Sequence, residues 1–359
     1  MSIKTNAGNF FEDFRAGDTL VHAVPRTVTD GDSALYVSLY GDRYPLHCSD
    51  EFAQSLGYEC GTINDLLVFH VVFGKTVNDV SLNAVANLGY AGLRFLAPVY
   101  PGDTLRSVSK VIGKKENASG QNGIVWVHTT GENQRGEKVL EYYRWVMVNK
   151  RDPNTKTGAD DRPKLPSEVK PEELVVAPCL DLSKFEGWPA GGRAFFEDYE
   201  RGERIHHVDG MTIEEAEHMI ATRLYQNTAK VHFDAHAAKN TRFGKRLIYG
   251  GHIISLARAL SFNGLENALA ILAWNGGTHA NPTFAGDTIY AWTDVLDKAE
   301  INGRPELGAL RVRLVGVKNA NPEKEDVQLR VKNDEGKESY GPAIVLDLDM
   351  WLLMPRRRG

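Results

Sequence analysis

The chain contains the stretch Phe10-Phe11-Glu12-Asp13-Phe14-Arg15-Ala16-Gly17-Asp18 and, 185 residues later, the related stretch Phe195-Phe196-Glu197-Asp198-Tyr199-Glu200-Arg201-Gly202-Glu203. A second related pair is Pro98-Val99-Tyr100-Pro101-Gly102-Asp103-Thr104-Leu105 and Pro282-Thr283-Phe284-Ala285-Gly286-Asp287-Thr288-Ile289, at an offset of 184. Two matches at nearly one offset, far apart in the chain, indicate an internal duplication.

The duplication divides the 359 residues into two halves, which suits the usual length of roughly 100–200 residues for a domain. We expect a first half at residues 1–151 and a second half at residues 193–359. Residues 152–192 are rich in Pro, Lys, Glu, Asp and Gly and have few apolar runs, a composition that is typical of a connection.

Each half continues with a short strand, a polar segment and a strongly apolar helix, at Asn64–Phe73 in the first half and Gly250–Leu260 in the second. A helix that is apolar on all sides must be wrapped by other elements. Segments rich in β-branched and aromatic residues follow and can supply this wrapping as antiparallel strands: Thr104–Ile112, Gly123–Thr130, Tyr142–Asn149, Ile289–Val295, Ala309–Val317, Val327–Val331 and Ala343–Leu353. We therefore predict an α+β fold in which a central helix wrapped by an antiparallel sheet occurs twice.

The composition excludes several classes of protein. The formal net charge is −5, with no basic face or tail, so we expect no nucleic-acid partner. No stretch reaches the ~18 apolar residues of a membrane span, and the first residues lack the apolar region of a signal peptide. We expect a cytoplasmic protein with no membrane contact.

The sequence also suggests no metal or cofactor. The three cysteines, Cys48, Cys60 and Cys179, have no CxxC spacing, which argues against a disulfide framework or a zinc site. His232 and His236 are spaced to meet on one helix face, but no third metal ligand is recognisable.

The segment Tyr40-Gly41-Asp42-Arg43-Tyr44-Pro45-Leu46-His47 places a carboxylate and an imidazole around a proline. Because proline breaks a helix, we interpret the segment as a loop in which Asp42 and His47 can converge. Together they can hold one water, with one group accepting its proton and the other fixing its orientation. Taken alone, the spacing fits a capping Asp42 and a surface His47 better. The offset of 185 pairs these two residues with Asn227 and His232.

This segment resembles the motif of the MaoC-like hydratases, the R-specific enoyl-CoA hydratases, and departs from it at Tyr44, where the family often has Asn. The segment Phe95-Leu96-Ala97-Pro98-Val99-Tyr100-Pro101-Gly102-Asp103-Thr104-Leu105 is also similar to that family. Because the resemblance covers both halves, it implies a double-hotdog subunit. It implies that Asp42 and His47 activate the water that adds to an α,β-unsaturated thioester, with no cofactor.

The resemblance further implies that a backbone N–H at the start of the central helix polarises the thioester carbonyl. A helix N-terminus suits developing negative charge. In the first half we expect this role near Asn64 and Asp65, although the family commonly has glycine at Asp65. In the second half Gly250 keeps the glycine, but Asn227 cannot act as a base, so His232 would work alone or with another partner. We expect a degenerate second site that shapes the cleft.

Asn64-Asp65-Leu66-Leu67 and the long connection resemble the mesaconyl-CoA hydratase branch of the family, also called β-methylmalyl-CoA dehydratase. This resemblance implies reversible addition of water to mesaconyl-CoA, giving β-methylmalyl-CoA. A substrate with a free carboxylate needs a cation, for which Arg43 and Arg94 are candidates, although such an arginine is more often solvated or salt-bridged. We place Tyr40 of the motif with the residues that contact substrate.

The expected partner is thus an acyl-CoA, and the expected assembly is a homodimer formed through sheet edges. Three alternatives stay open: a hydratase for another enoyl-CoA, a hotdog thioesterase whose water attacks the carbonyl, and a CoA-thioester binding module without activity. The sequence separates them only through the complete Asp42 and His47 motif.

Overall fold

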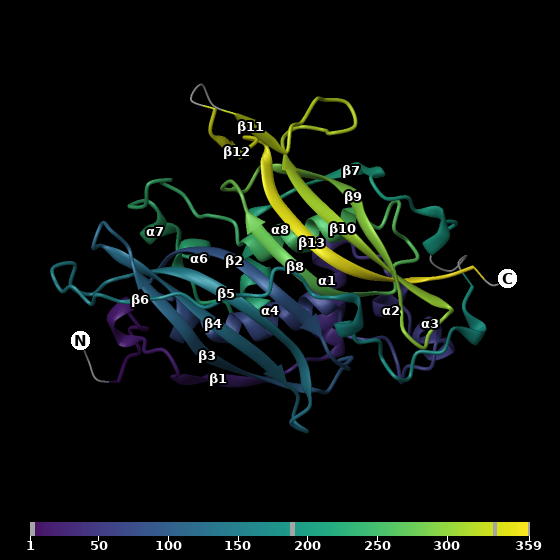
Figure 1. Cartoon of the computed structure of the whole chain (residues 1–359), viewed down its shortest axis with the longest axis horizontal. Helices are drawn as coiled ribbons and strands as arrows, with labels where there is room; N and C mark the ends of the chain where they lie inside the picture. Colours follow the sequence, from purple (N-terminus) through teal and green to yellow (C-terminus); the bar gives the residue numbers. More distant parts are fainter. Residues whose placement is uncertain (1–3, 187–190, 333–335, 358–359) are drawn as a thin grey trace.

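A computed structural model describes residues 4–186, 191–332 and 336–357, so residues 187–190 of the expected connection lie outside the described ranges. The strands form one broad antiparallel sheet, with α4 and α8 behind it in the view of Figure 1. Among the described helices, none is both long and apolar enough to cross a membrane.

The described part of this sheet has eleven strands in the order β1-β3-β4-β5-β2-β8-β13-β10-β9-β7, with β6 beside β3. The order in the second half mirrors that in the first. The central pair, β2 and β8, joins the halves, with Tyr90 opposite Gly277 and Leu93 opposite Trp274. The strands are β1 (Thr19–Thr27), β2 (Ala84–Phe95), β3 (Thr104–Glu116), β4 (Asn122–Glu132), β5 (Lys138–Asn149), β6 (Asp160–Asp161), β7 (Arg204–Thr212), β8 (Ala270–His279), β9 (Thr288–Glu300), β10 (Leu307–Lys318) and β13 (Ile344–Pro355).

The two apolar helices are the centres of the halves, as predicted. Every residue of α4 after Asp65 and every residue of α8 after Gly250 is buried. The α+β prediction, with a wrapped central helix in each half, is confirmed. The α-helices are α1 (Asp30–Tyr40), α2 (Pro45–Cys48), α3 (Asp50–Ser55), α4 (Asp65–Thr76), α5 (Glu215–Leu224), α6 (Lys230–Phe233), α7 (Ala235–Ala238) and α8 (Gly250–Leu260).

The repeated Phe-Phe-Glu-Asp stretch forms the same short 3-10 turn in both halves, at Phe11–Asp13 and Phe196–Asp198. The aspartate of each turn accepts a hydrogen bond from the backbone N–H of the residue before the turn, at 2.9 and 2.8 Å. The phenylalanine that begins each turn packs on a strand glycine, because a Cβ on Gly123 or Gly308 would lie 2.3 Å from its ring. The repeat therefore fastens the start of each half to its sheet.

The structure corrects several sequence predictions. Val327–Val331 is not a strand of the main sheet: Arg330–Lys332 forms β11, which pairs with β12 (Glu338–Tyr340) and with no other described strand. The polar segments after the first strands contain helices α1 and α5. Pro45 does not keep its segment in a loop but occupies the first turn of the short helix α2, where its missing N–H is not needed.

The strands that join the halves, β2 and β8, were not predicted from the sequence. The first part of β2, Ala84-Val85-Ala86-Asn87-Leu88-Gly89-Tyr90-Ala91-Gly92, has several small residues that are poor strand formers by propensity. Packing requires glycine at two of these positions. A Cβ on Gly89 would lie 2.5 Å from the Trp145 ring, and a Cβ on Gly92 would lie 2.6 Å from the Pro166 ring.

Equivalent residues of the two halves touch one another between the central helices. The hydroxyls of Tyr40 and Tyr225, which are 185 residues apart, lie 2.6 Å apart, and Tyr40 also contacts His252 Nδ1 at 2.8 Å. His70 Nε2 lies 2.9 Å from the hydroxyl of Ser255, again at an offset of 185. Contacts between equivalent positions place these residues beside a twofold pseudo-axis that relates the halves.

The histidines of this interface are buried and favour the neutral form. Burial lowers the pKa of His252 to about 3 and that of His218 to about 2, and holds the pKa of His70 well below its usual value. A protonated imidazole here would lose hydration without gaining a carboxylate partner. The interface between the halves therefore requires these histidines to stay uncharged.

Lowering the pH from 7 to 5 should destabilise the fold. The folded pKa values lie below the unfolded value of about 6.5, so the unfolded chain binds protons first and stability is lost as pH falls below 6.5. The loss is about 2 kcal/mol at pH 5 for each histidine that stays neutral. Urea unfolding at both pH values measures it.

The variant His252→Gln should reduce this pH dependence, because one buried imidazole is gone, whereas His236→Gln at an exposed position of α7 should not. A free energy of unfolding that is the same at pH 7 and pH 5 would contradict this account of the interface.

Candidate active site

Asp42 follows helix α1 directly, where Gly41 ends the helix in the left-handed conformation at a φ of 61°. The Asp42 side chain is buried, with 6% of its surface exposed. Its Oδ2 accepts a hydrogen bond from Asn64 Nδ2 at 2.6 Å, and its Oδ1 accepts one from the Tyr44 backbone N–H at 3.2 Å. Asp42 is therefore not a helix cap but a buried, oriented carboxylate.

His47 lies in the short helix α2 and is also buried, at 9% exposure. Its Nδ1 is 3.2 Å from the carbonyl oxygen of Thr62 and 3.0 Å from the Thr62 hydroxyl. A carbonyl only accepts, so Nδ1 carries the hydrogen and Nε2 is free to accept a proton. Asp42 and His47 are thus both anchored on the same short segment, residues 62–64, which leads into α4.

Asn64 connects this pair to the central helix. Its amide nitrogen donates to Asp42, while its Oδ1 accepts from the backbone N–H of Leu66 at 2.8 Å and so caps α4. The N–H of Asp65, at the first position of the helix, has no acceptor within the helix. The N-terminus of α4, with its partial positive charge, therefore lies beside the Asp42 carboxylate.

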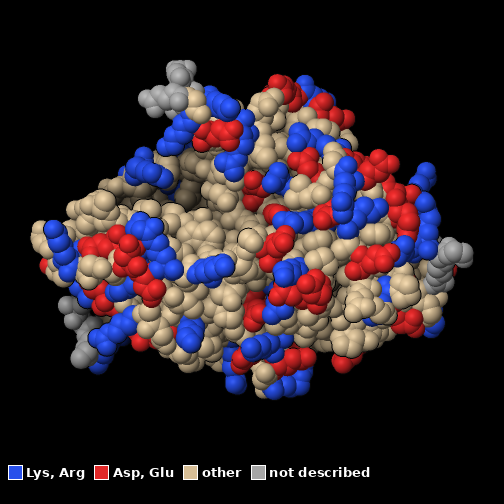
Figure 2. Space-filling model, viewed as in Figure 1, with Lys and Arg blue, Asp and Glu red and all other residues tan. Residues whose placement is uncertain are grey.

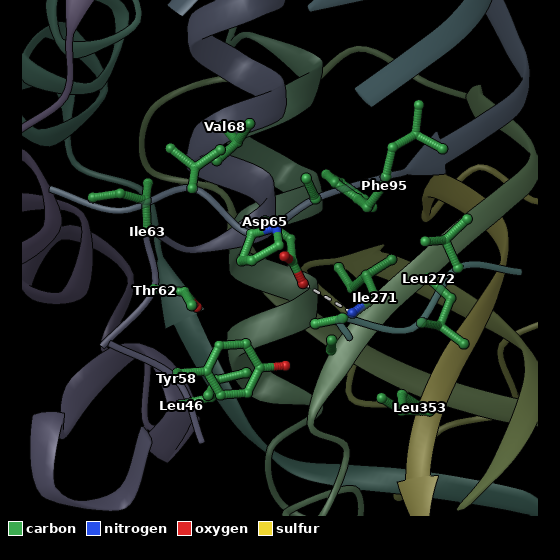
Figure 3. Close-up of a pocket in the computed structure, with 17 residues that line it drawn as sticks. Leu46, Tyr58, Thr62, Ile63, Asp65, Val68, Phe95, Ile271, Leu272 and Leu353 are labelled. Carbon is green, nitrogen blue, oxygen red and sulfur yellow. Dashed lines mark hydrogen bonds between the residues drawn. The ribbon is translucent and has the colours of Figure 1, made fainter. Parts of the chain in front are cut away.

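Asp65 extends from the start of α4 into a pocket, where its Oδ2 accepts a hydrogen bond from the Ile271 backbone N–H at 2.9 Å (Figure 3). Burial raises the pKa of the Asp65 carboxyl, while the charges of His47 and Arg258 lower it and that of Asp42 raises it. These four ionisable groups therefore act on one another at one end of α4.

Both halves and the connection contribute to this pocket. In Figure 3 Tyr58, Thr62 and Leu46 lie on one side of Asp65, and Phe95 and Leu272 lie on the other. A mostly apolar pocket with a few polar groups at one end suits an acyl thioester. The lining residues are Leu46, Tyr58, Thr62, Ile63, Asp65, Val68, Phe95, Leu96, Ala97, Pro98, Val99, Val175, Ala177, Ala270, Ile271, Leu272 and Leu353.

Three residues that we expected to contact substrate do not line this pocket. Tyr40 is fully buried at the pseudo-axis, where its hydroxyl contacts Tyr225, and it does not line the pocket. Arg43 is exposed and stacks over Phe262, with 4.6 Å from its guanidinium carbon to the ring centroid. Arg94 forms an ion pair of 2.6 Å with Glu141 on the neighbouring strand.

The second half keeps part of the same arrangement. His232 Nδ1 contacts the Leu247 carbonyl at 2.9 Å, as His47 contacts that of Thr62, and Asn227 accepts from the Ala229 N–H at 3.0 Å. Burial lowers the pKa of His232 to about 4.

Two features distinguish the second half from the first at the start of its central helix. Tyr249 stands where Asn64 stands in the first half, so the amide that holds the carboxylate is missing. The His279 ring covers the start of α8, because a Cβ on Gly250 would lie 2.4 Å from it.

Sequence reasoning missed Thr62, Tyr249, His279 and the buried Arg258. The offset of 185 could have found Tyr249 and His279, since it pairs them with Asn64 and Arg94. No sequence signal identifies Arg258, which reaches the first site from the second half. As for metal binding, no three His, Cys, Asp or Glu side chains gather as a metal site in the part of the chain that the structure describes.

The chain is similar to known proteins over nearly its whole length. The family model for mesaconyl-CoA hydratase matches residues 3–323. The β-methylmalyl-CoA dehydratase of Chloroflexus aurantiacus is 58% identical over 357 residues, which cover 99% of this chain and 100% of that protein. The mesaconyl-CoA hydratase of Cereibacter sphaeroides is 55% identical over 354 residues, covering 99% and 100%.

Solved structures show the same fold. The crystal structure of a MaoC-domain dehydratase from Chloroflexus aurantiacus matches with a TM-score of 0.94 at 58% identity, covering 99% of this chain and 100% of that chain. A Mycobacterium tuberculosis protein described as a double hotdog matches with a TM-score of 0.76 at 23% identity, covering 97% and 98%. The predicted double-hotdog fold is confirmed, and the chain belongs to the mesaconyl-CoA hydratase family.

Proposed function

We propose that this protein catalyses the reversible addition of water to the double bond of mesaconyl-CoA, giving β-methylmalyl-CoA. Family membership supports the reaction. One structural observation carries the assignment of the site: the buried Asp42 and His47 are both fixed to the segment that begins α4, beside a mostly apolar pocket. The site has the base, the orienting group and the helix N-terminus that hydration requires.

In the proposed mechanism one water molecule lies between Asp42 and His47. Both groups present acceptors, a carboxylate oxygen and the imidazole Nε2, so they hold the two water hydrogens and leave a lone pair directed at the substrate. One group removes a proton as the oxygen bonds to the β-carbon, and a proton is delivered to the α-carbon. The reverse sequence of steps removes water.

The start of α4 stabilises the charge that develops during this addition. As the oxygen attacks the β-carbon, negative charge moves to the thioester oxygen, which the Asp65 N–H and the helix N-terminus can stabilise. The Asn64 side chain occupies the Leu66 N–H, so it leaves the Asp65 N–H for the substrate. The Asp65 side chain is directed to Ile271 and is not part of this interaction.

We further propose that the protein acts as a homodimer in the cytoplasm, with halves at residues 1–151 and 193–359 and a connection at 152–192. The strands at the two ends of the sheet, β1 and β7, expose Val21, Val24 and Val208 by 77%, 62% and 52%, which favours association through these edges.

The described thiols are all free, as in a reducing compartment. Acidic and basic side chains are interspersed on the visible face, which offers no extended basic surface (Figure 2).

A thioester assay separates hydration from thioester hydrolysis, the rival reaction. Incubation with mesaconyl-CoA should lower the enoyl-thioester absorbance to an equilibrium value without releasing free thiol. Adding β-methylmalyl-CoA should raise the absorbance to the same equilibrium. Stoichiometric thiol release would identify a thioesterase, and unchanged absorbance would identify a binding module.

The variant Asp42→Asn should lose at least about 1,000-fold in kcat, because an amide cannot accept the water proton. Its amide oxygen can still accept from Asn64, but its NH2 then faces the Tyr44 N–H, so the free energy of unfolding should fall by about 1–3 kcal/mol. The matched change in the second half, Asn227→Ala, should keep kcat within about threefold. Near-wild-type kcat in Asp42→Asn would reject the assignment of the base.

Replacing the histidine of the first half should lower kcat far more than replacing the histidine of the second half. His47→Ala should lower kcat by about 100-fold or more, whereas His232→Ala should change kcat little, because the second site lacks its carboxylate and is covered by His279. Steady-state rates with mesaconyl-CoA measure both. Equal losses would show that the second half shares in catalysis.

A further inference from the structure

A buried guanidinium from the second half lies beside the first-half site. Arg258, on α8, is only 6% exposed, and its Nη1 contacts the Tyr44 hydroxyl and, at 3.0 Å, the Ser261 hydroxyl. The guanidinium carbon lies 3.6 Å from the centroid of the Tyr44 ring. Within the described ranges, none of the ion pairs includes Arg258.

Such an arrangement is costly unless the charge has a further use. A buried ion without an opposite charge loses hydration that hydroxyls and an aromatic face replace only in part. Buried arginines in proteins are therefore normally paired with a carboxylate or phosphate, often through two parallel hydrogen bonds. Arg258 has no such partner among the described residues and, unlike the likewise buried Arg144, it lies on Tyr44 of the motif segment.

The position of Arg258 indicates which anion it can bind. Tyr44, on which Arg258 stacks, donates its backbone N–H to Asp42, and the charge of Arg258 lowers the pKa of Asp65 at the start of α4. Arg258 thus belongs to the environment of the proposed water site. In mesaconyl-CoA the free carboxylate is bonded to the same carbon that receives the water, so its cation must lie close to Asp42 and His47.

We propose that Arg258 binds the free carboxylate of the substrate and so selects carboxylated enoyl-CoA esters over those with a plain alkyl end. This inference rests on the proposed function. The hydroxyls of Tyr44 and Ser261 hold the guanidinium in place, and its positive charge offsets the repulsion between the substrate carboxylate and Asp42. Arg94, paired with Glu141, and Arg43, exposed on Phe262, are less suited to this role.

Two thioesters that differ only in the free carboxylate provide the test. They are mesaconyl-CoA and (E)-2-methylbut-2-enoyl-CoA, in which a methyl group replaces the carboxylate. Arg258→Met keeps the length and apolar packing of the side chain and removes the charge. We expect kcat/KM for mesaconyl-CoA to fall by about 100-fold or more, while kcat/KM for the methyl analogue is unchanged or rises.

Two further variants separate binding of the substrate carboxylate from a general disturbance of the fold. Arg258→Lys keeps the charge but loses the paired hydrogen bonds, and its ratio of the two kcat/KM values should lie between those of wild type and Arg258→Met. Arg144→Met is a matched control: Arg144 is fully buried, lies 4.3 Å from the Phe73 ring and also takes part in none of the described ion pairs. Any loss of activity in Arg144→Met should affect both substrates equally.

Equal losses for the two substrates in Arg258→Met, or an unchanged ratio in both Arg258 variants, would overturn the inference while leaving the proposed function intact. A wild-type protein that hydrates neither thioester would instead contradict the proposed function itself.

Discussion

The pairing of β2 with β8 across the twofold pseudo-axis is the constraint on which the rest of the structure depends. Neither α4 nor α8 is exposed to water, because every residue of α4 after Asp65 and every residue of α8 after Gly250 is buried within the two joined halves. The polar groups caught between the helices satisfy one another, as the Tyr40 and Tyr225 hydroxyls do. Burial of the axis also brings Arg258 of the second half onto the ring and hydroxyl of Tyr44 in the first.

The two halves have diverged around this common frame. At the start of α4, Asn64 holds a carboxylate and leaves the helix N-terminus open to a pocket. At the start of α8, Tyr249 and the His279 ring occupy the corresponding space. The start of the central helix thus borders a pocket in the first half and is covered by side chains in the second. The second half contributes packing at the interface and the helix α8, from which Arg258 contacts Tyr44.

Much of the fold and part of the site could be predicted from the sequence. The Phe-Phe-Glu-Asp repeat and the apolar helices are patterns of neighbouring residues. They were therefore enough to predict two related halves, each with a central helix wrapped by a sheet. The strands β2 and β8 were missed because Gly89 and Gly92 are set by neighbouring side chains and not by strand propensity. Arg258 was missed for a similar reason: its closeness to Tyr44 exists only after the halves pack, at a separation of 214 residues.

A crystal structure of the Asp42→Asn variant with mesaconyl-CoA bound tests the central claim most directly. The account predicts one substrate per chain, with its thioester carbonyl at the start of α4, its double bond beside His47 and its free carboxylate on Arg258. A substrate bound at the start of α8 beside His232, or one whose thioester lies away from both helix starts, would contradict the account.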